Sequence, residues 1–181
     1  MLQLISLLVE NKPGALMRVT GVLAARGYNI ESLTVARTLD DELSRMSIVV
    51  DVEPNQRAQV IKQMNKLINV LQAQDLSEGA AVRRELALVR VRATKENRAA
   101  ILREAEIFGA RAVDSSIEGF ALEATGDSEK LNEFFDVMQT YGEIEVTRSG
   151  MVAVSLDIKK LKLAPPVRKD ELETVSGKKA E

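Results

Sequence analysis

Apolar residues near the start of the chain follow first a strand-like and then a helix-like pattern. Residues 2–9 are apolar on nearly both alternating faces, which predicts a strand packed on helices on one side and partly covered on the other. Pro13 and Gly27 bound a segment whose apolar residues recur at helical spacing: Leu16, Val19, Val22 and Leu23. We therefore expect a strand, a loop and a helix.

A hairpin and a second helix are predicted to follow. Residues 28–37 are extended and contain Thr and Val, Asp40–Glu42 supplies a turn, and apolar residues alternate with polar ones from Met46 to Val52. After Pro54, five apolar residues recur with a helical period: Val60, Ile61, Met64, Leu67 and Ile68. Residues 70–76 are predicted to form a short closing strand. The predicted order is βαββαβ.

The second half repeats this order at an offset of 82 residues, with Leu4 aligned on Leu86, although few residues are identical. A strand over 85–93 precedes a helix that Thr94 is expected to cap and Gly109 to end. Strands near 110–115 and 120–124 precede a helix capped by Asp127 or Ser128, and the last strand lies within 144–156.

The predicted fold class is α+β, with two ferredoxin-like βαββαβ domains in tandem. The expected domains are residues 1–78 and 83–157, and residues 158–181, which contain Pro165-Pro166 and no periodic apolar spacing after Leu163, are expected to be a disordered tail. A sheet of this kind leaves an edge strand and an uncovered face, so we expect at least a dimer.

Composition narrows the possible chemistry. The chain has 181 residues, no Cys and no His, which excludes disulfides, thiol nucleophiles, Ser-His-Asp triads and imidazole acid–base catalysis. The net charge is −2 and aromatic residues make up 3% of the chain, so nucleic-acid binding is not expected. The absence of a long apolar run or a signal-peptide pattern predicts a cytoplasmic protein without a membrane partner.

The loop from Asn11 to Leu16 is the candidate functional site. It joins a strand to a helix N-terminus, where unpaired N–H groups favour a carboxylate, and Gly14 allows close approach to the backbone. Asn11 and Asn29 each offer a carboxamide that can donate and accept hydrogen bonds, as a small zwitterion requires. The alternative is that these residues only start a helix and turn the chain, and residue types alone favour that alternative.

Other candidate sites have less support. Asp40, Asp41 and Glu42 are acidic neighbours that could suggest a hard-metal site, but acidic residues in a hairpin turn are usually solvated. Asn11 with Arg18 is similar to the residue pair of small phosphatases with this fold, but a Gly-rich phosphate cradle is absent from the sequence.

Several motifs occur together: ENKPG at 10–14, RGYNIESLTV at 26–35, SRMSIVV at 44–50, QMNKLINVL at 63–71 and RELALVRV at 84–91. With them, the chain closely resembles the regulatory (small) subunit of acetolactate synthase, also called acetohydroxyacid synthase, over nearly all residues before the tail. The first half resembles an ACT domain, which is an amino-acid sensor. The second half resembles the C-terminal domain of the small subunit.

The resemblance implies a noncatalytic regulatory subunit of branched-chain amino acid biosynthesis. Its partner would be the catalytic large subunit, which condenses pyruvate with pyruvate or 2-oxobutyrate and is expected to carry thiamine diphosphate, Mg²⁺ and FAD, whereas this chain would hold no cofactor. The small subunit would raise the activity of that partner and confer feedback inhibition by valine or related amino acids. The alternative is a free-standing ACT protein that senses amino acids and acts on another enzyme.

The resemblance also implies an effector site between two ACT domains of a homodimer. One chain would contribute the loop and the other would contribute the start of a strand: Asn11, Pro13, Gly14, Ala15 and Leu16, with Asn29 and Ile30. The helix N-terminus would bind the carboxylate, the Asn carbonyls the ammonium, and Leu16 or Ile30 the aliphatic side chain. Arg37, where the family often has Pro, is the departure that could alter the hairpin.

Overall fold

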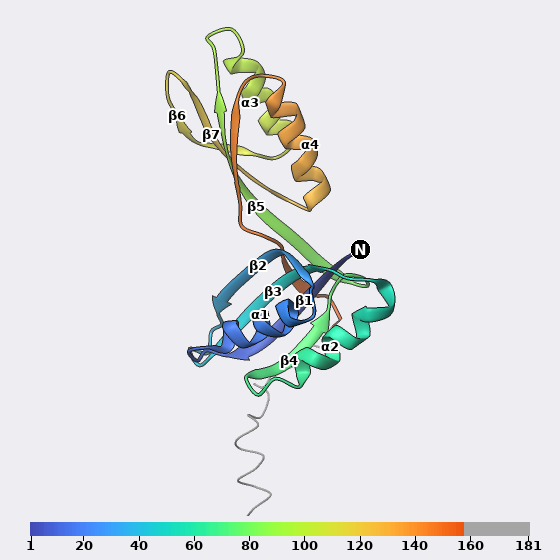
Figure 1. Ribbon diagram of the computed structural model, residues 1–181. Helices are drawn as coiled ribbons and strands as arrows, with labels where there is room; N and C mark the ends of the chain where they lie inside the picture. The colour runs from blue at the N-terminus through green and yellow to red at the C-terminus, as the bar shows by residue number, and fades with distance from the viewer. Residues whose placement is uncertain (158–181) are drawn as a thin grey trace, which may run out of the picture. The chain divides into compact units, whose positions relative to one another are not determined.

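The computed structural model describes residues 1–157 and divides them into two compact units (Figure 1). The first unit contains residues 1–82 together with 153–157, and the second contains residues 83–152. The predicted disordered tail at 158–181 lies outside the described residues. No helix in the described part of the chain combines the length and the apolar character needed to cross a membrane.

The first unit is a four-stranded antiparallel sheet with two helices on one face (Figure 1). The strand order is β2-β3-β1-β4, so β2 and β4 are the edges. The elements are β1 (Leu2–Glu10), α1 (Ala15–Ala25), β2 (Asn29–Arg37), β3 (Leu43–Asp51), a 3₁₀ turn (Pro54–Gln56), α2 (Arg57–Asn65) and β4 (Val70–Asp75). This order is the predicted βαββαβ arrangement.

Alternate residues of the central strands form the core of the first unit. The helix-facing side chains of β1 pack with buried residues of both helices: Ile5, Leu7, Val9, Val19, Leu23, Val60 and Met64. On the opposite face of β1, Leu4, Ser6 and Leu8 are also buried. The prediction of a strand covered on both faces is therefore confirmed, and each fully buried aliphatic side chain contributes about 1.5–3 kcal/mol to folding.

Asp75 anchors the end of β4 through its carboxylate. Ser77 donates to it from its hydroxyl at 2.5 Å and its backbone N–H at 2.9 Å, and Gln3 Nε2 donates at 2.6 Å. Burial alone would raise the pKa of Asp75, but these hydrogen bonds and the nearby Arg57 guanidinium outweigh burial, and the pKa is lowered.

The second unit has the same arrangement, with sheet order β6-β7-β5-β8. Its elements are β5 (Ala81–Arg92), α3 (Arg98–Ile107), β6 (Arg111–Ser115), β7 (Gly119–Gly126), α4 (Ser128–Gln139) and β8 (Ile144–Arg148). A further strand, β9 (Val152–Ser155), also pairs with β5. The repeated order confirms the predicted tandem ferredoxin-like fold.

The core of the second unit lies between its sheet and its helices. Alternate β5 residues pack with the apolar faces of α3 and α4: Ala87, Val89, Val91, Ile101, Ala105, Phe134 and Met138. Gly119 fits where β7 passes β5, because a Cβ there would lie 2.0 Å from the carbonyl oxygen of Val91. Glu85 is 6% exposed and accepts hydrogen bonds from Arg148 at 2.8 and 2.6 Å, which joins β5 to β8.

Three local predictions need correction and one is confirmed. α3 begins at Arg98 rather than after Thr94, because Asn97 occupies the cap position and its side chain accepts from the N–H of Thr94 at 2.8 Å. α2 ends at Asn65, which leaves Ile68 63% exposed rather than in the helix core. The last predicted strand is two strands, β8 and β9, with a positive-φ glycine between them. Asp127 caps α4, as predicted, by accepting from the N–H of Lys130 at 2.9 Å.

Candidate functional site

A tight turn connects β1 to α1 and sets the direction of the helix N-terminus. Gly14 occupies the N-cap position with φ of +83°, a left-handed conformation that favours glycine. The N–H of Ala15 donates to the carbonyl of Lys12 at 3.2 Å, and the N–H of Arg18 donates to the carbonyl of Gly14 at 3.0 Å. The turn therefore holds the helix start open to its surroundings, and Gly14 is itself exposed.

The first turn of α1 leaves backbone donors available. Within residues 1–157, the N–H groups of Leu16 and Met17 have no acceptor. Together with the helix dipole, such N–H groups favour a carboxylate. A Cβ placed on Gly14 would have no atom of residues 1–157 within 4 Å apart from its two sequence neighbours, so the space beside these donors is open.

Asn11 is anchored to the turn between β2 and β3. Its N–H donates to the carbonyl of Glu42 at 2.7 Å, and its side-chain Nδ2 donates to the carbonyl of Asp41 at 2.8 Å. A pocket of about 220 Å³ lies here, lined by Glu10, Asn11, Lys12, Asp41 and Glu42. The loop predicted from the sequence is thus tied to a second loop from a distant part of the chain.

Lys12, in the loop before α1, forms an ion pair within the chain. Its ammonium lies 3.0 Å from Glu10 Oε1, and Asn69 Nδ2 donates to Glu10 Oε2 at 2.7 Å. Lys12 is therefore directed toward Glu10 and away from an anionic group at this helix start. The three acidic residues of the pocket favour a cationic group beside Asn11.

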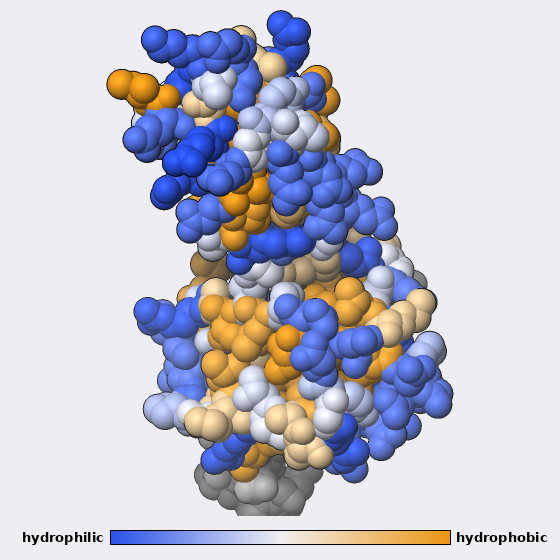
Figure 2. All heavy atoms as spheres, turned by 45° about the horizontal axis from the view of Figure 1, so that its top comes forward, coloured by the Kyte–Doolittle hydropathy of each residue, from blue (hydrophilic) through white to orange (hydrophobic). Residues whose placement is uncertain are grey.

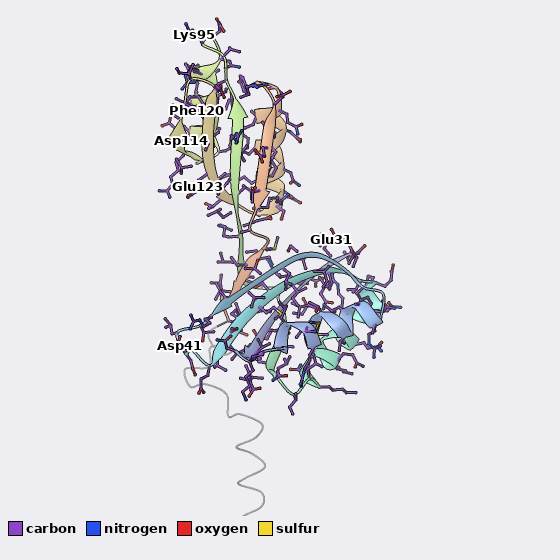
Figure 3. The ribbon with its side chains drawn as sticks, turned by 60° about the vertical axis from the view of Figure 1, so that its left-hand side comes forward. Glu31, Asp41, Lys95, Asp114, Phe120 and Glu123 are labelled. Carbon is purple, nitrogen blue, oxygen red and sulfur yellow. The ribbon has the colours of Figure 1, made fainter. Side chains whose placement is uncertain are left out.

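Asn29 and Ile30 lie at the other end of the same sheet. Asn29 pairs with Asp51 at the end of β3, which also pairs with Leu2 at the start of β1. The loop after Glu10 is eight residues further along β1, a separation of about 27 Å in an extended strand. Figure 3 shows the same separation, with Glu31 and Asp41 labelled at opposite ends of the sheet. One chain therefore does not bring the two halves of the predicted site together.

The edge of the first unit that carries β2 also exposes apolar side chains. Leu16 is 43% exposed, Met17 75% and Val35 42%. Figure 2 shows apolar side chains gathered on the visible face of this unit. Ile30, in contrast, packs partly against the core of its own unit. Of the two aliphatic residues of the predicted site, Leu16 thus offers the larger free surface.

Two of the acidic residues Asp40–Glu42 form contacts within the hairpin turn. Asp40 Oδ1 accepts from the N–H of Glu42 at 3.0 Å, and Asp41 Oδ1 lies 3.3 Å from Arg37 Nη1. Across residues 1–157, no group of three or more acidic, His or Cys side chains is placed to hold a metal ion. The Arg37–Asp41 pair also gives Arg37 a local role in the hairpin.

A larger hollow of about 460 Å³ lies on the helix-free face of the second sheet, between β5, β7 and β8. Its rim carries the ion pairs Arg92–Glu143 at 2.9 Å and Arg90–Glu145 at 3.7 Å, and all four side chains are largely exposed. Exposed pairs of this kind are typical of a solvated surface. Although this hollow is larger than the pocket at Asn11, it lacks backbone donors of a helix start, and we regard the Asn11 loop as the better candidate.

Sequence reasoning missed the partners that hold the two Asn residues. The carbonyls of Asp41 and Glu42 hold Asn11, and Glu31 accepts a hydrogen bond from Asn29 Nδ2. The contact with Asn11 depends on the register of the β2–β3 hairpin, for which the sequence carries no direct signal. The sequence carries no direct signal for the second contact either, because Glu31 lies where the pairing of β2 with β3 shifts register and strand alternation does not apply.

Comparisons with known proteins agree with the fold. A family model described as the AHAS small subunit-like ACT domain matches residues 5–72, and one described as the small subunit of acetolactate synthase matches residues 84–157. The chain is 49% identical over 150 residues to a probable acetolactate synthase small subunit of Archaeoglobus fulgidus, covering 83% of this chain and 94% of that protein. It is 46% identical over 151 residues to the Mycolicibacterium smegmatis small subunit, covering 83% and 89%.

Among solved structures, the acetolactate synthase small subunit of Thermotoga maritima is similar, with a TM-score of 0.77 and 35% identity. The similarity covers 86% of this chain and 97% of that chain. Both units of the chain therefore have counterparts in one known type of protein.

Proposed function

Because the chain belongs to the family of acetolactate synthase small subunits, we propose that it raises the activity of a catalytic large subunit and makes that activity sensitive to valine or related amino acids. The chain itself is a noncatalytic subunit of that enzyme. In this proposal the reaction takes place on the large subunit, which supplies thiamine diphosphate, Mg²⁺ and FAD. The small subunit supplies the effector site.

The observation that best supports a shared effector site is the separation of Asn11 and Asn29 along the first sheet. β2 is an edge strand, and its residues Leu33–Arg37 pair with β3 without interruption, so its outer edge can accept another strand. A two-fold axis at this edge would pair β2 with its copy in antiparallel fashion. The Asn29 end of one copy would then lie at the Arg37 end of the other, where the hairpin turn holds Asn11.

The proposed site combines opposite charges with an apolar wall. The N–H groups of Leu16 and Met17 would bind the carboxylate of the effector, and the side chains of Asn11 and of Asn29 from the second copy would accept from its ammonium. The exposed side chain of Leu16 would contact the aliphatic group. Leucine and isoleucine each have one more methylene than valine, worth about 1–3 kcal/mol in an apolar pocket, so several branched-chain amino acids are expected to act.

Binding at an interface can regulate a distant active site only if the two dimer arrangements differ in effector affinity. A coupling free energy of about 1–3 kcal/mol is sufficient for inhibition. An effector that contacts both copies has this property, because a shift of one copy relative to the other changes its contacts.

The test is the rate of acetolactate formation by the matching large subunit, measured with and without this chain and titrated with valine, leucine and isoleucine. We expect the chain to raise the rate and at least one of these amino acids to reverse the increase. An unchanged rate, together with failure of the two proteins to co-purify, would indicate a sensor that acts on another enzyme. Turnover by this chain alone would contradict a noncatalytic role.

A further inference from the structure

The side-chain amide of Asn29 has its orientation set by Glu31. Asn29 Nδ2 donates to Glu31 Oε1, and a carboxylate can only accept hydrogen bonds. The amino group of the amide must therefore face Glu31, and the carbonyl oxygen Oδ1 must face away. The pairing of β2 with β3 shifts register between Ile30 and Ser32, and such a bulge redirects the side chain of the inserted residue. Figure 3 shows Glu31 at this end of the sheet.

Asn11 is oriented in the same sense by a different partner. Its Nδ2 donates to the backbone carbonyl of Asp41 at 2.8 Å, and a carbonyl is also only an acceptor. Its own N–H, bonded to the carbonyl of Glu42 at 2.7 Å, fixes the backbone from which the amide projects. In both Asn residues, the amide nitrogen donates one hydrogen bond within the chain, which turns the carbonyl oxygen away from that partner and leaves it as an acceptor.

Two outward carbonyl oxygens define what can bind between them. An α-ammonium group donates to both, whereas the oxygen of a 2-oxo acid has no hydrogen to donate and would face two acceptors. A 2-hydroxy acid has one donor hydrogen and would satisfy one of the two. Sites built around a ligand's donor group discriminate strongly against analogues that lack it, because the buried polar groups of the site are then left unpaired.

We propose that Glu31 is a positioning residue that holds the Asn29 carbonyl toward the effector, so that the site selects α-amino acids over the 2-oxo and 2-hydroxy acids with the same carbon skeleton. This inference rests on the proposed two-copy effector site. It gives the regulatory subunit a specific property: it responds to the aminated compound and not to the 2-oxo acids on which acetolactate synthases act.

The experiment is calorimetry on the full chain with L-valine and with the 2-hydroxy and 2-oxo acids that carry the side chain of valine. For the unmodified chain, we expect the 2-hydroxy acid to bind at least about 10-fold and the 2-oxo acid at least about 100-fold more weakly than valine. The matched variants are Glu31→Ala, which removes the acceptor, and Glu31→Gln, which keeps an acceptor oxygen without the charge. Glu53→Ala, at another exposed acidic residue of the first unit, is the control.

In Glu31→Ala the amide of Asn29 is free to rotate, so we expect valine to bind about 5–10-fold more weakly and the preference over the 2-oxo acid to shrink by at least that factor. In Glu31→Gln and Glu53→Ala, both quantities should stay within about threefold of the unmodified chain. Because Glu31 is exposed, loss of fold is not expected, and circular dichroism checks it.

Two results would overturn the positioning role. The first is an unchanged preference in Glu31→Ala, and the second is an equal loss in Glu31→Gln and Glu31→Ala, which would assign the effect to charge. If the unmodified chain binds no branched-chain amino acid, the proposed function fails and this inference fails with it. If valine binds but Glu31→Ala keeps the full preference for valine over the 2-oxo acid, the proposed function stands and only the positioning role of Glu31 is refuted.

Discussion

Replacing Gly14 with Asp or with Asn separates two ways of disrupting the helix start. Asp and Asn have nearly the same shape, and both tolerate the left-handed φ of +83° better than other non-glycine residues. Within the described residues, the added Cβ would have no atom within 4 Å apart from the two sequence neighbours. Both can accept from backbone donors of the first turn. The two variants therefore share the conformational cost of about 1 kcal/mol and differ in charge.

The charge difference can be converted into an expected loss of affinity. A ligand carboxylate bound at the N–H groups of Leu16 and Met17 would lie about 5 Å from a carboxylate on residue 14, and two like charges at this distance repel by about 3 kcal/mol at an effective dielectric constant of 20. Solvent at this exposed loop reduces the repulsion to about half. We expect Gly14→Asp to bind valine at least about tenfold more weakly than Gly14→Asn.

Calorimetry with valine on the unmodified chain and both variants measures this difference, and circular dichroism checks that the variants fold. Equal weakening in Gly14→Asp and Gly14→Asn would mean that backbone conformation, and not an anion at the helix start, explains the effect. If Gly14→Asp binds valine as tightly as the unmodified chain, the loop from Asn11 to Leu16 is not part of the effector site.

Further predictions concern stability and are measured by urea unfolding of the full chain. Glu85→Ala breaks a largely buried ion pair and should cost about 2 kcal/mol, whereas Glu143→Ala, at an exposed pair, should cost less than about 0.5 kcal/mol; equal costs would contradict the difference in burial. The lowered pKa of Asp75 stabilises the fold above about pH 4, and this contribution is lost as the pH falls below that value. In Asp75→Asn, the free energy of unfolding should therefore fall less steeply with decreasing pH below about pH 4. Gly119→Ala should cost about 3 kcal/mol, because its Cβ meets the Val91 carbonyl, and a smaller cost than for Glu143→Ala would refute the close approach.

Much of the fold could be predicted because the determining signals are local. The spacing of Leu16, Val19 and Leu23, with Gly27 after them, indicates α1, which runs from Ala15 to Ala25 in the structure. The signal for α4 is equally local: Asp127 directly precedes the helix, and the structure shows it as the N-cap. The repeated βαββαβ order then limits the sheet topology to a small number of arrangements.

Features that depend on contacts between distant residues could not be predicted. Asn97 rather than Thr94 occupies the α3 cap, and Asn97 Nδ2 also donates to the carbonyl of Tyr141 at 2.9 Å, a tertiary contact without a sequence pattern. The division of the last strand depends on the turn at Gly150. In each of these two segments, the start of α3 and the last predicted strand, the local sequence is compatible with two structures. Contacts with the rest of the fold determine which one forms.

The candidate site was predicted in part. The strand–Pro–Gly–helix pattern located the helix start, and the open left-handed Gly14 agrees with it. The anchoring of Asn11 by Asp41 and the placement of Asn29 at the far end of the sheet follow from hairpin register, which residue types do not encode directly. The role of Glu31 depends on its hydrogen bond with Asn29, which the sequence does not indicate.

The central claim is that each effector site takes its loop from one chain and Asn29 from another. Mixing two defective chains tests it directly: Gly14→Asp in one, Asn29→Ala in the other, with different affinity tags so that the mixed dimer can be purified. Each variant alone should bind valine weakly at every site. In the mixed dimer, one site combines both defects and the other combines two unmodified halves, so the account predicts one site of unmodified affinity per dimer. No site of unmodified affinity in the mixed dimer would contradict a site shared between two copies.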